Sequence, residues 1–149
     1  KGTRLLYCNA NKGDNDALTL DPRNKEMLSG ITYLSDGIME YQDTPPFDCF
    51  AIQNDIDKIL RLNGKIDSEH ICRQDTSTQL VKHRKDVFQN TEQICIDCLT
   101  RGILTVEWLD SKIQECLSRE RREDFAGVAI FVYKTYLNRL QERRHLQEG

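Results

Sequence analysis

The stretch from Asn90 to Leu117, NTEQICIDCLTRGILTVEWLDSKIQECL, contains three of the six cysteines and the only tryptophan, and it has the clearest helix boundaries. Asn90 with Gln93 three residues later is typical of a helix start, because the N-cap side chain accepts a hydrogen bond from a free backbone amide. Gly102 is typical of a helix end, since glycine adopts positive φ at little cost. These signals predict a short helix over about 91–101.

A second helix is predicted directly after Gly102. Thr105 can cap it, with Glu107 in the first turn, where a negative charge interacts favourably with the helix dipole. The apolar residues that follow recur at spacings of three and four, which makes one apolar stripe: Trp108 or Leu109, Ile113, Cys116 and Leu117. The two helices, joined by a short turn, should form a hairpin with Trp108 in its seam.

Two further helices are predicted before this hairpin. Asp21-Pro22 is typical of a helix start, and the heptad-like apolar spacing up to Tyr41 predicts a helix over about 22–42. A proline pair ends it, and a second helix over about 46–62 ends at Asn63-Gly64. The outer face of this second helix is expected to carry solvated charges: Asp48, Asp55, Asp57 and Lys58.

The remaining segments are less uniform. The segment from Ile66 to Asp75 has no clear type, and the apolar spacing after Thr76 predicts a helix that stops at the Asn90 cap. After the charged run SRERRED, apolar residues at helical spacing predict a helix over about 120–145.

Together these patterns predict an all-α fold, a compact bundle of five to seven helices in a single domain over 1–149, with an irregular N-terminal arm over 1–20. Strand alternation is not found in the periodic segments. The expected core comprises Met27, Ile31, Leu34, Phe50, Ile56, Leu60, Leu80, Val87, Ile94, Trp108, Ile113, Val128 and Phe131.

Composition limits the classes of function. With 38% hydrophobic and 30% charged residues among 149, the chain is suited to a packed core, and it is long enough to bury about two thirds of its unfolded surface. A net charge of −3 gives no electrostatic reason to expect nucleic acid as a partner. No apolar run is long enough to predict a membrane span. The chain begins at Lys1, so a mature product and a fragment both stay open.

The cysteines leave the compartment open. In a secreted chain the six cysteines, an even number, would form disulfides between helices. In a cytoplasmic chain their thiols would instead be free and buried. Cys95 and Cys98 are poorly placed to bond to each other on one helix, so any disulfides are expected to join them to Cys116 or Cys72. A third bond would then join the remaining pair, Cys8 and Cys49.

Catalytic and metal-binding motifs give little support for an enzyme. Cys95-Ile96-Asp97-Cys98 with His70 and Cys72 upstream has only half of a zinc-site spacing, and no glycine-containing turn surrounds it. No nucleophile elbow, phosphate-binding loop or H-E-x-x-H sequence occurs. We therefore expect a chain that is not an enzyme and uses no cofactor or metal.

Two functions remain as hypotheses. The first is a non-enzymatic helical binding domain that docks a protein partner through an apolar helix face or groove. The second is a secreted, disulfide-stapled helical carrier of a small apolar ligand. The aromatic residues expected to line a ligand site are Trp108, Phe125, Phe131 and Tyr133.

Overall fold

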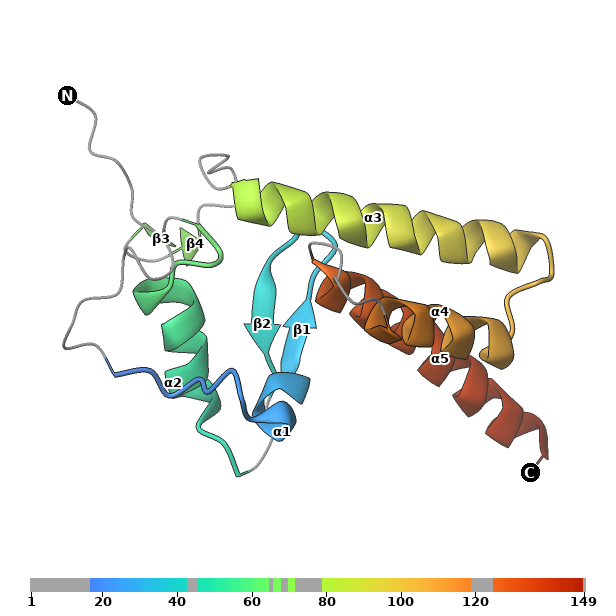
Figure 1. Cartoon of the computed structure of the whole chain (residues 1–149), viewed down its shortest axis with the longest axis horizontal. Helices are drawn as coiled ribbons and strands as arrows, with labels where there is room; N and C mark the ends of the chain where they lie inside the picture. The colour runs from blue at the N-terminus through green and yellow to red at the C-terminus, as the bar shows by residue number, and fades with distance from the viewer. Residues whose placement is uncertain are drawn as a thin grey trace. The chain divides into compact units, whose positions relative to one another are not determined.

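A computed structural model of the chain describes residues 17–42, 46–64, 66–67, 70–71, 79–118 and 125–148. The chain divides into two compact units, Lys1–His83 and Arg84–Gly149 (Figure 1). The prediction of a mostly helical chain is confirmed, although the first unit also contains two small antiparallel hairpins that were not predicted. The number of helices in a bundle and the single domain over 1–149 stay predictions, and most of the predicted arm lies outside the described residues.

The first unit combines short helices with short strands. Helix α1 (Lys25–Ser29) leads into strands β1 (Ile31–Tyr33) and β2 (Met39–Tyr41), which pair with Ile31 opposite Tyr41. Helix α2 (Cys49–Asn54) continues directly into a π-helix, η2 (Asp55–Ile59). Strands β3 (Ile66–Asp67) and β4 (His70–Ile71) form the second hairpin, in the segment whose type the sequence left open.

The predicted helix over 22–42 is wrong. Asn24, not Asp21, caps α1 by accepting a hydrogen bond from the Met27 amide at 3.1 Å, and the helix ends after five residues. Gly37 adopts a φ of 86° in the turn that follows β1. Residues with a side chain disfavour this conformation, whereas glycine adopts it readily. The apolar residues between Met27 and Tyr41 thus belong to a short helix and a hairpin. Each of these elements also turns its apolar residues to one side, so their spacing resembled that of a single helix.

Gly30 allows the hairpin to fold back onto α1. The Tyr41 hydroxyl donates to the Met27 carbonyl at 2.8 Å, and this brings the tyrosine ring directly over Gly30. A Cβ atom at position 30 would lie 2.6 Å from the ring carbon Cζ of Tyr41. The absence of a side chain at Gly30 is thus what permits this contact.

The edge of β2 that faces away from β1 is bonded to side-chain amides. Asn63 accepts from the Met39 amide at 2.7 Å and donates to the Met39 carbonyl at 2.8 Å, while Gln53 accepts from the Tyr41 amide at 2.7 Å. Asp57 holds both amides in place, since it accepts from Gln53 at 2.9 Å and from Asn63 at 2.7 Å. These bonds satisfy backbone groups that a bare strand edge would expose.

The predicted helix over 46–62 is present as α2 and η2, and Asp48 caps it by accepting from the Ala51 amide at 3.0 Å. The expectation that Asp55 is solvated is wrong, because this residue is only 2% exposed. Its Oδ2 atom accepts from the amides of Thr19 and Leu20, each at 2.7 Å. Asp55 therefore attaches the chain ahead of α1 to the helix.

The second unit contains most of a long helix, α3 (Gln79–Thr100), followed by α4 (Val106–Ser118) and α5 (Ala126–Glu148), and each helix turns back along the one before it (Figure 1). The predicted start at Asn90 is wrong, because α3 continues through this residue without a break. The predicted end is confirmed: Gly102 has a φ of 70°, and the Ile103 amide donates to the Cys98 carbonyl at 2.9 Å. The Thr105 cap is also confirmed, since its hydroxyl accepts from the Trp108 amide at 3.1 Å.

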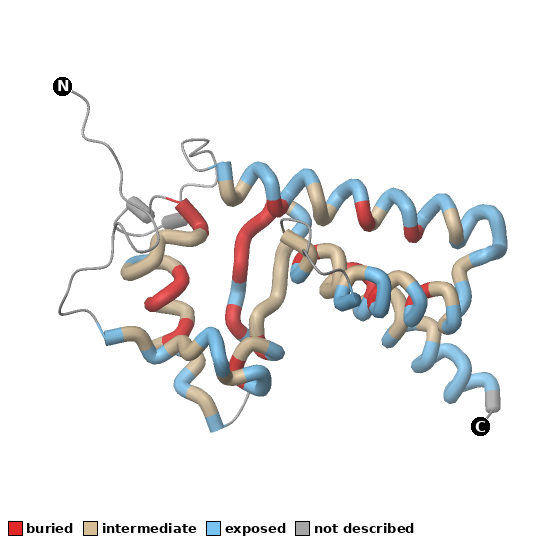
Figure 2. The backbone as a smooth tube through the Cα atoms, in the orientation of Figure 1, coloured by how far each residue is buried: buried red, intermediate tan, exposed pale blue. Residues whose placement is uncertain are grey.

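Each unit has its own core (Figure 2). The first comprises Met27, Met39, Tyr41, Ile52 and Ile56, and the second comprises Cys95, Leu109, Ile113 and Tyr133.

Among the predicted core residues, Met27, Ile56, Ile113 and Val128 are buried as expected. Ile31, Leu34, Leu60, Leu80, Val87, Trp108 and Phe131 are partly buried. Phe50 is 85% exposed and Ile94 is 45% exposed, so their prediction as core is wrong. On a helix with 3.6 residues per turn, Phe50 lies about 200° around the axis from the buried Ile52. Ile94 lies about 100° from the buried Cys95.

Candidate functional site

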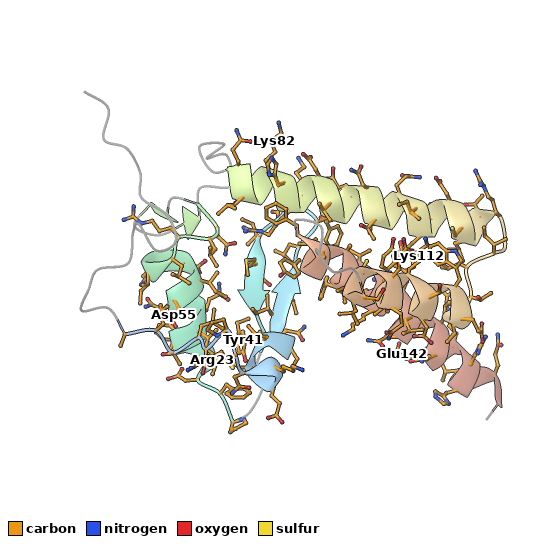
Figure 3. The ribbon with its side chains drawn as sticks, in the orientation of Figure 1. Arg23, Tyr41, Asp55, Lys82, Lys112 and Glu142 are labelled. Atoms are coloured by element: carbon orange, nitrogen blue, oxygen red, sulfur yellow. The ribbon has the colours of Figure 1, made fainter. Side chains whose placement is uncertain are left out.

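A groove of about 320 Å³ lies among the three helices of the second unit. Tyr133 and Ala129 of α5 form its apolar wall. On α4 the Lys112 ammonium pairs with the Glu115 carboxylate at 3.0 Å, and Lys112 is labelled in Figure 3. Its lining is mixed in polarity and comprises Val87, Asn90, Thr91, Ile94, Lys112, Glu115, Cys116, Ala126, Ala129 and Tyr133. The groove can therefore take an apolar group that also carries polar atoms.

Two of the four predicted ligand-binding residues are in direct contact. The rings of Trp108 and Tyr133 meet edge to face, with centroids 6.0 Å apart and planes at 80°. The Lys112 ammonium lies 5.8 Å from the centre of the Trp108 ring, a cation–π distance. Trp108 thus contacts α5 through Tyr133, and Tyr133 connects it to the groove.

The other two predicted residues lie elsewhere on α5. Phe131 packs against Phe88 of α3 with ring centroids 6.5 Å apart. Phe131 and Tyr133 are two residues apart on α5, which places them about 200° apart around the helix axis. Phe125 precedes α5 with a φ of 63°, and its carbonyl accepts from the Val128 amide at 2.9 Å. The four aromatic residues therefore do not share one helix face.

Burial controls the acid–base behaviour of the groups beside the groove. Burial raises the pKa of the Tyr133 hydroxyl to about 12, with the nearby thiols of Cys95 and Cys116 adding to the shift. Burial, reinforced by the neighbouring Cys98, raises the pKa of the Cys95 thiol to about 11. Cys95 is therefore a protonated thiol at neutral pH, unlike the thiolate of an activated cysteine nucleophile.

Among the described residues, no disulfide is formed by the four cysteines Cys49, Cys95, Cys98 and Cys116. The bonds expected from Cys95 or Cys98 to Cys116 are not formed, and Cys8 and Cys72 lie outside the described residues. Within the part of the chain that the structure describes, no three His, Cys, Asp or Glu side chains are gathered as metal ligands.

A second surface feature lies at the carboxyl end of α3, and sequence reasoning missed it. Ile96, Leu99 and Ile103 are 42%, 50% and 49% exposed, and we call these three residues the exposed apolar stripe. The spacing of three between Ile96 and Leu99 was the signal that could have revealed them, because it places both residues on the same side of the helix. Ile103 follows just beyond the end of α3. Figure 2 shows how largely exposed this end of α3 is.

Comparison of the chain with models of known protein families, with characterised proteins and with solved structures found no match. No helix among the described residues has the length and apolar character needed to cross a membrane. The groove and the exposed apolar stripe are the surface features from which a function for this chain can be inferred.

Proposed function

We propose that this chain is a non-enzymatic helical binding domain that docks a protein partner through the exposed apolar stripe of α3. The observation that carries the proposal is the exposure of three aliphatic side chains: Ile96 and Leu99 lie three residues apart on α3, and Ile103 lies just beyond its end. Positions i and i+3 lie on the same side of a helix, and an amphipathic helix contacts an apolar partner surface through such positions. A partner that contributes an apolar groove or a second amphipathic helix fits this spacing.

The local backbone supports the same proposal, because the stripe is held in place before any partner binds. The amides of Gly102 and Ile103 donate to the carbonyls of Leu99 and Cys98 at 3.0 and 2.9 Å, which closes the helix end. Ile103 is thereby fixed within one turn of Leu99. A surface that is ordered in advance loses less conformational entropy on binding.

Polar groups beside the stripe are those expected at the rim of an interface. Asp97 and Arg101 are exposed, and Gln93 donates to the Asp97 carboxylate at 2.8 Å one turn along the helix. Apolar residues at the centre with charged and polar residues around them are typical of protein interfaces.

A photo-crosslinking amino acid at the exposed Thr100 position, next to the stripe, tests this proposal in extracts of the cells that make the protein. We expect a defined protein adduct that is lost in Leu99→Asp and kept in Leu146→Asp, a matched control at an 82% exposed leucine of α5. Circular dichroism of both variants checks that they fold. The same adducts in both variants, or no adduct from the chain that carries the crosslinking residue at position 100 alone, would contradict docking through the stripe.

The competing function is that of a carrier for a small apolar ligand, and the groove beside Tyr133 favours it. Its volume of about 320 Å³ is at the lower end of the range for small-molecule sites. Trp108 contacts Tyr133, so a ligand in the groove should change tryptophan emission. Saturable binding of a fluorescent lipophilic probe that Ala129→Phe abolishes would favour the carrier over protein docking.

A further inference from the structure

The chain contains one Asn-Gly sequence, Asn63-Gly64, which begins four residues after the end of the π-helix η2 of the first unit. Asn63 is only 1% exposed, and its amide side chain forms the bonds that hold the edge of β2. Asn-Gly is chemically the most labile asparagine pair, because glycine has no side chain to hinder attack by its own backbone nitrogen. A labile pair therefore occupies a position on which the first unit depends.

We infer that Asn63-Gly64 is a site of spontaneous deamidation that is closed while Asn63 is bonded to β2 and open when this contact opens. In the reaction the Gly64 nitrogen attacks Cγ of Asn63, the bond from Cγ to Nδ2 breaks, and ammonia leaves with the proton from Gly64. Water then opens the cyclic imide at either carbonyl. The product is aspartate or isoaspartate at position 63, so the only co-reactant is water.

In the folded chain both reacting groups are engaged. The Gly64 amide donates to the Arg61 carbonyl at 3.2 Å, so the attacking nitrogen is held in a turn. The Asn63 side chain is fixed at both ends, with Oδ1 accepting from Met39 and Nδ2 donating to Met39 and Asp57 at 2.7–2.8 Å. Cγ can reach the Gly64 nitrogen only after these bonds break, which ties the reaction rate to the population of the opened state.

Conversion would also prevent the contact from re-forming. The Nδ2 group that now donates to the Asp57 carboxylate at 2.7 Å would become a carboxylate oxygen facing another carboxylate. It would also face the Met39 carbonyl, which accepts from Nδ2 at 2.8 Å. Like charges and paired acceptors at these distances repel, so the modified chain would keep the edge of β2 open.

The rate is tested on the intact chain by peptide mapping with mass spectrometry during incubation at mildly alkaline pH, with and without denaturant. We expect deamidation at Asn63 to be at least about tenfold slower in the folded chain. Gln53→Ala, which removes the neighbouring bond to β2, should accelerate it, whereas Gln93→Ala, the same change on α3, should not. Equal rates with and without denaturant, or no acceleration by Gln53→Ala, would overturn the inference.

The effect of deamidation on the edge of β2 is tested on protein that has deamidated during incubation. This test does not require that a substituted variant folds. Ion exchange separates the converted chains, and hydrogen exchange then compares the amides of Met39 and Tyr41 in the two fractions. We expect faster exchange in the converted fraction, and the same result for Asn63→Asp but not for Asn138→Asp on the exposed face of α5. Unchanged exchange at Met39 in the converted fraction would show that the modification does not release β2.

Discussion

Replacing Asp55 with alanine should detach the chain ahead of α1 from the first unit. The carboxylate is 2% exposed and accepts two backbone hydrogen bonds, from Thr19 and Leu20, each at 2.7 Å. A hydrogen bond to a charged group contributes about 1.5–3 kcal/mol. Thr19 is itself exposed, so its amide can bond to water after the substitution. We therefore expect the free energy of unfolding of the first unit to fall by about 2–4 kcal/mol.

Asp55→Asn refines the same test, because it keeps the shape and one acceptor oxygen but removes the charge. Neutral hydrogen bonds are roughly half as strong as charge-assisted ones, so about half of the alanine effect should remain. Hydrogen exchange followed by NMR at the amides of Thr19 and Leu20 measures the local effect, and Asp110→Ala on the exposed face of α4 is the matched control. Unchanged exchange at these two amides in Asp55→Ala would refute the proposed attachment.

Three further predictions concern two glycines and one thiol. Gly30→Ala should destabilise the first unit by about 1–3 kcal/mol in urea denaturation, because the new Cβ meets the Tyr41 ring at 2.6 Å. Gly102→Ala should cost only about 1 kcal/mol, since nothing lies within 4 Å of the new Cβ and only the φ of 70° is strained. Between pH 9.0 and about 11 the Cys95 thiol loses its proton in the unfolded chain but keeps it in the folded chain. The free energy of unfolding should therefore be highest below pH 9.0 and fall as the pH rises to about 11. Trp108 fluorescence in urea at several pH values measures this loss, and a pH dependence equal to that of Cys95→Ala would contradict it.

The helix boundaries that the sequence predicted correctly depend on residues that act within one turn. Gly102 and Thr105 end and start helices through bonds to residues three to five positions away, and the structure contains those bonds. Asn90 carries the same signal and fails, because the backbone on both sides of it continues the helix and Asn90 remains on the exposed surface of α3. A capping residue therefore marks a helix start only where the preceding chain leaves the helix.

The hairpin of β1 and β2 could not be predicted, because its stabilising contacts are distant in sequence. Asn63 and Gln53 bond to Met39 and Tyr41 across 24 and 12 residues, and no local pattern indicates these pairs. The same holds for Asp55, whose partners lie 35 and 36 residues earlier. A carboxylate on a predicted outer face looks solvated until the chain that covers it is located.

The candidate sites follow from an excess of apolar residues on α3. Near its carboxyl end, Cys95 points into the core, Ile94 lines the groove, and Ile96 and Leu99 lie partly exposed on the other side. Packing against a two-helix neighbour buries one side of a helix, so aliphatic residues on several sides exceed what α4 and α5 can cover. Contiguous exposed apolar residues are typical of surfaces that bind another molecule. This excess is why we propose docking at the exposed apolar stripe, and Leu99→Asp is the substitution that should separate binding from folding.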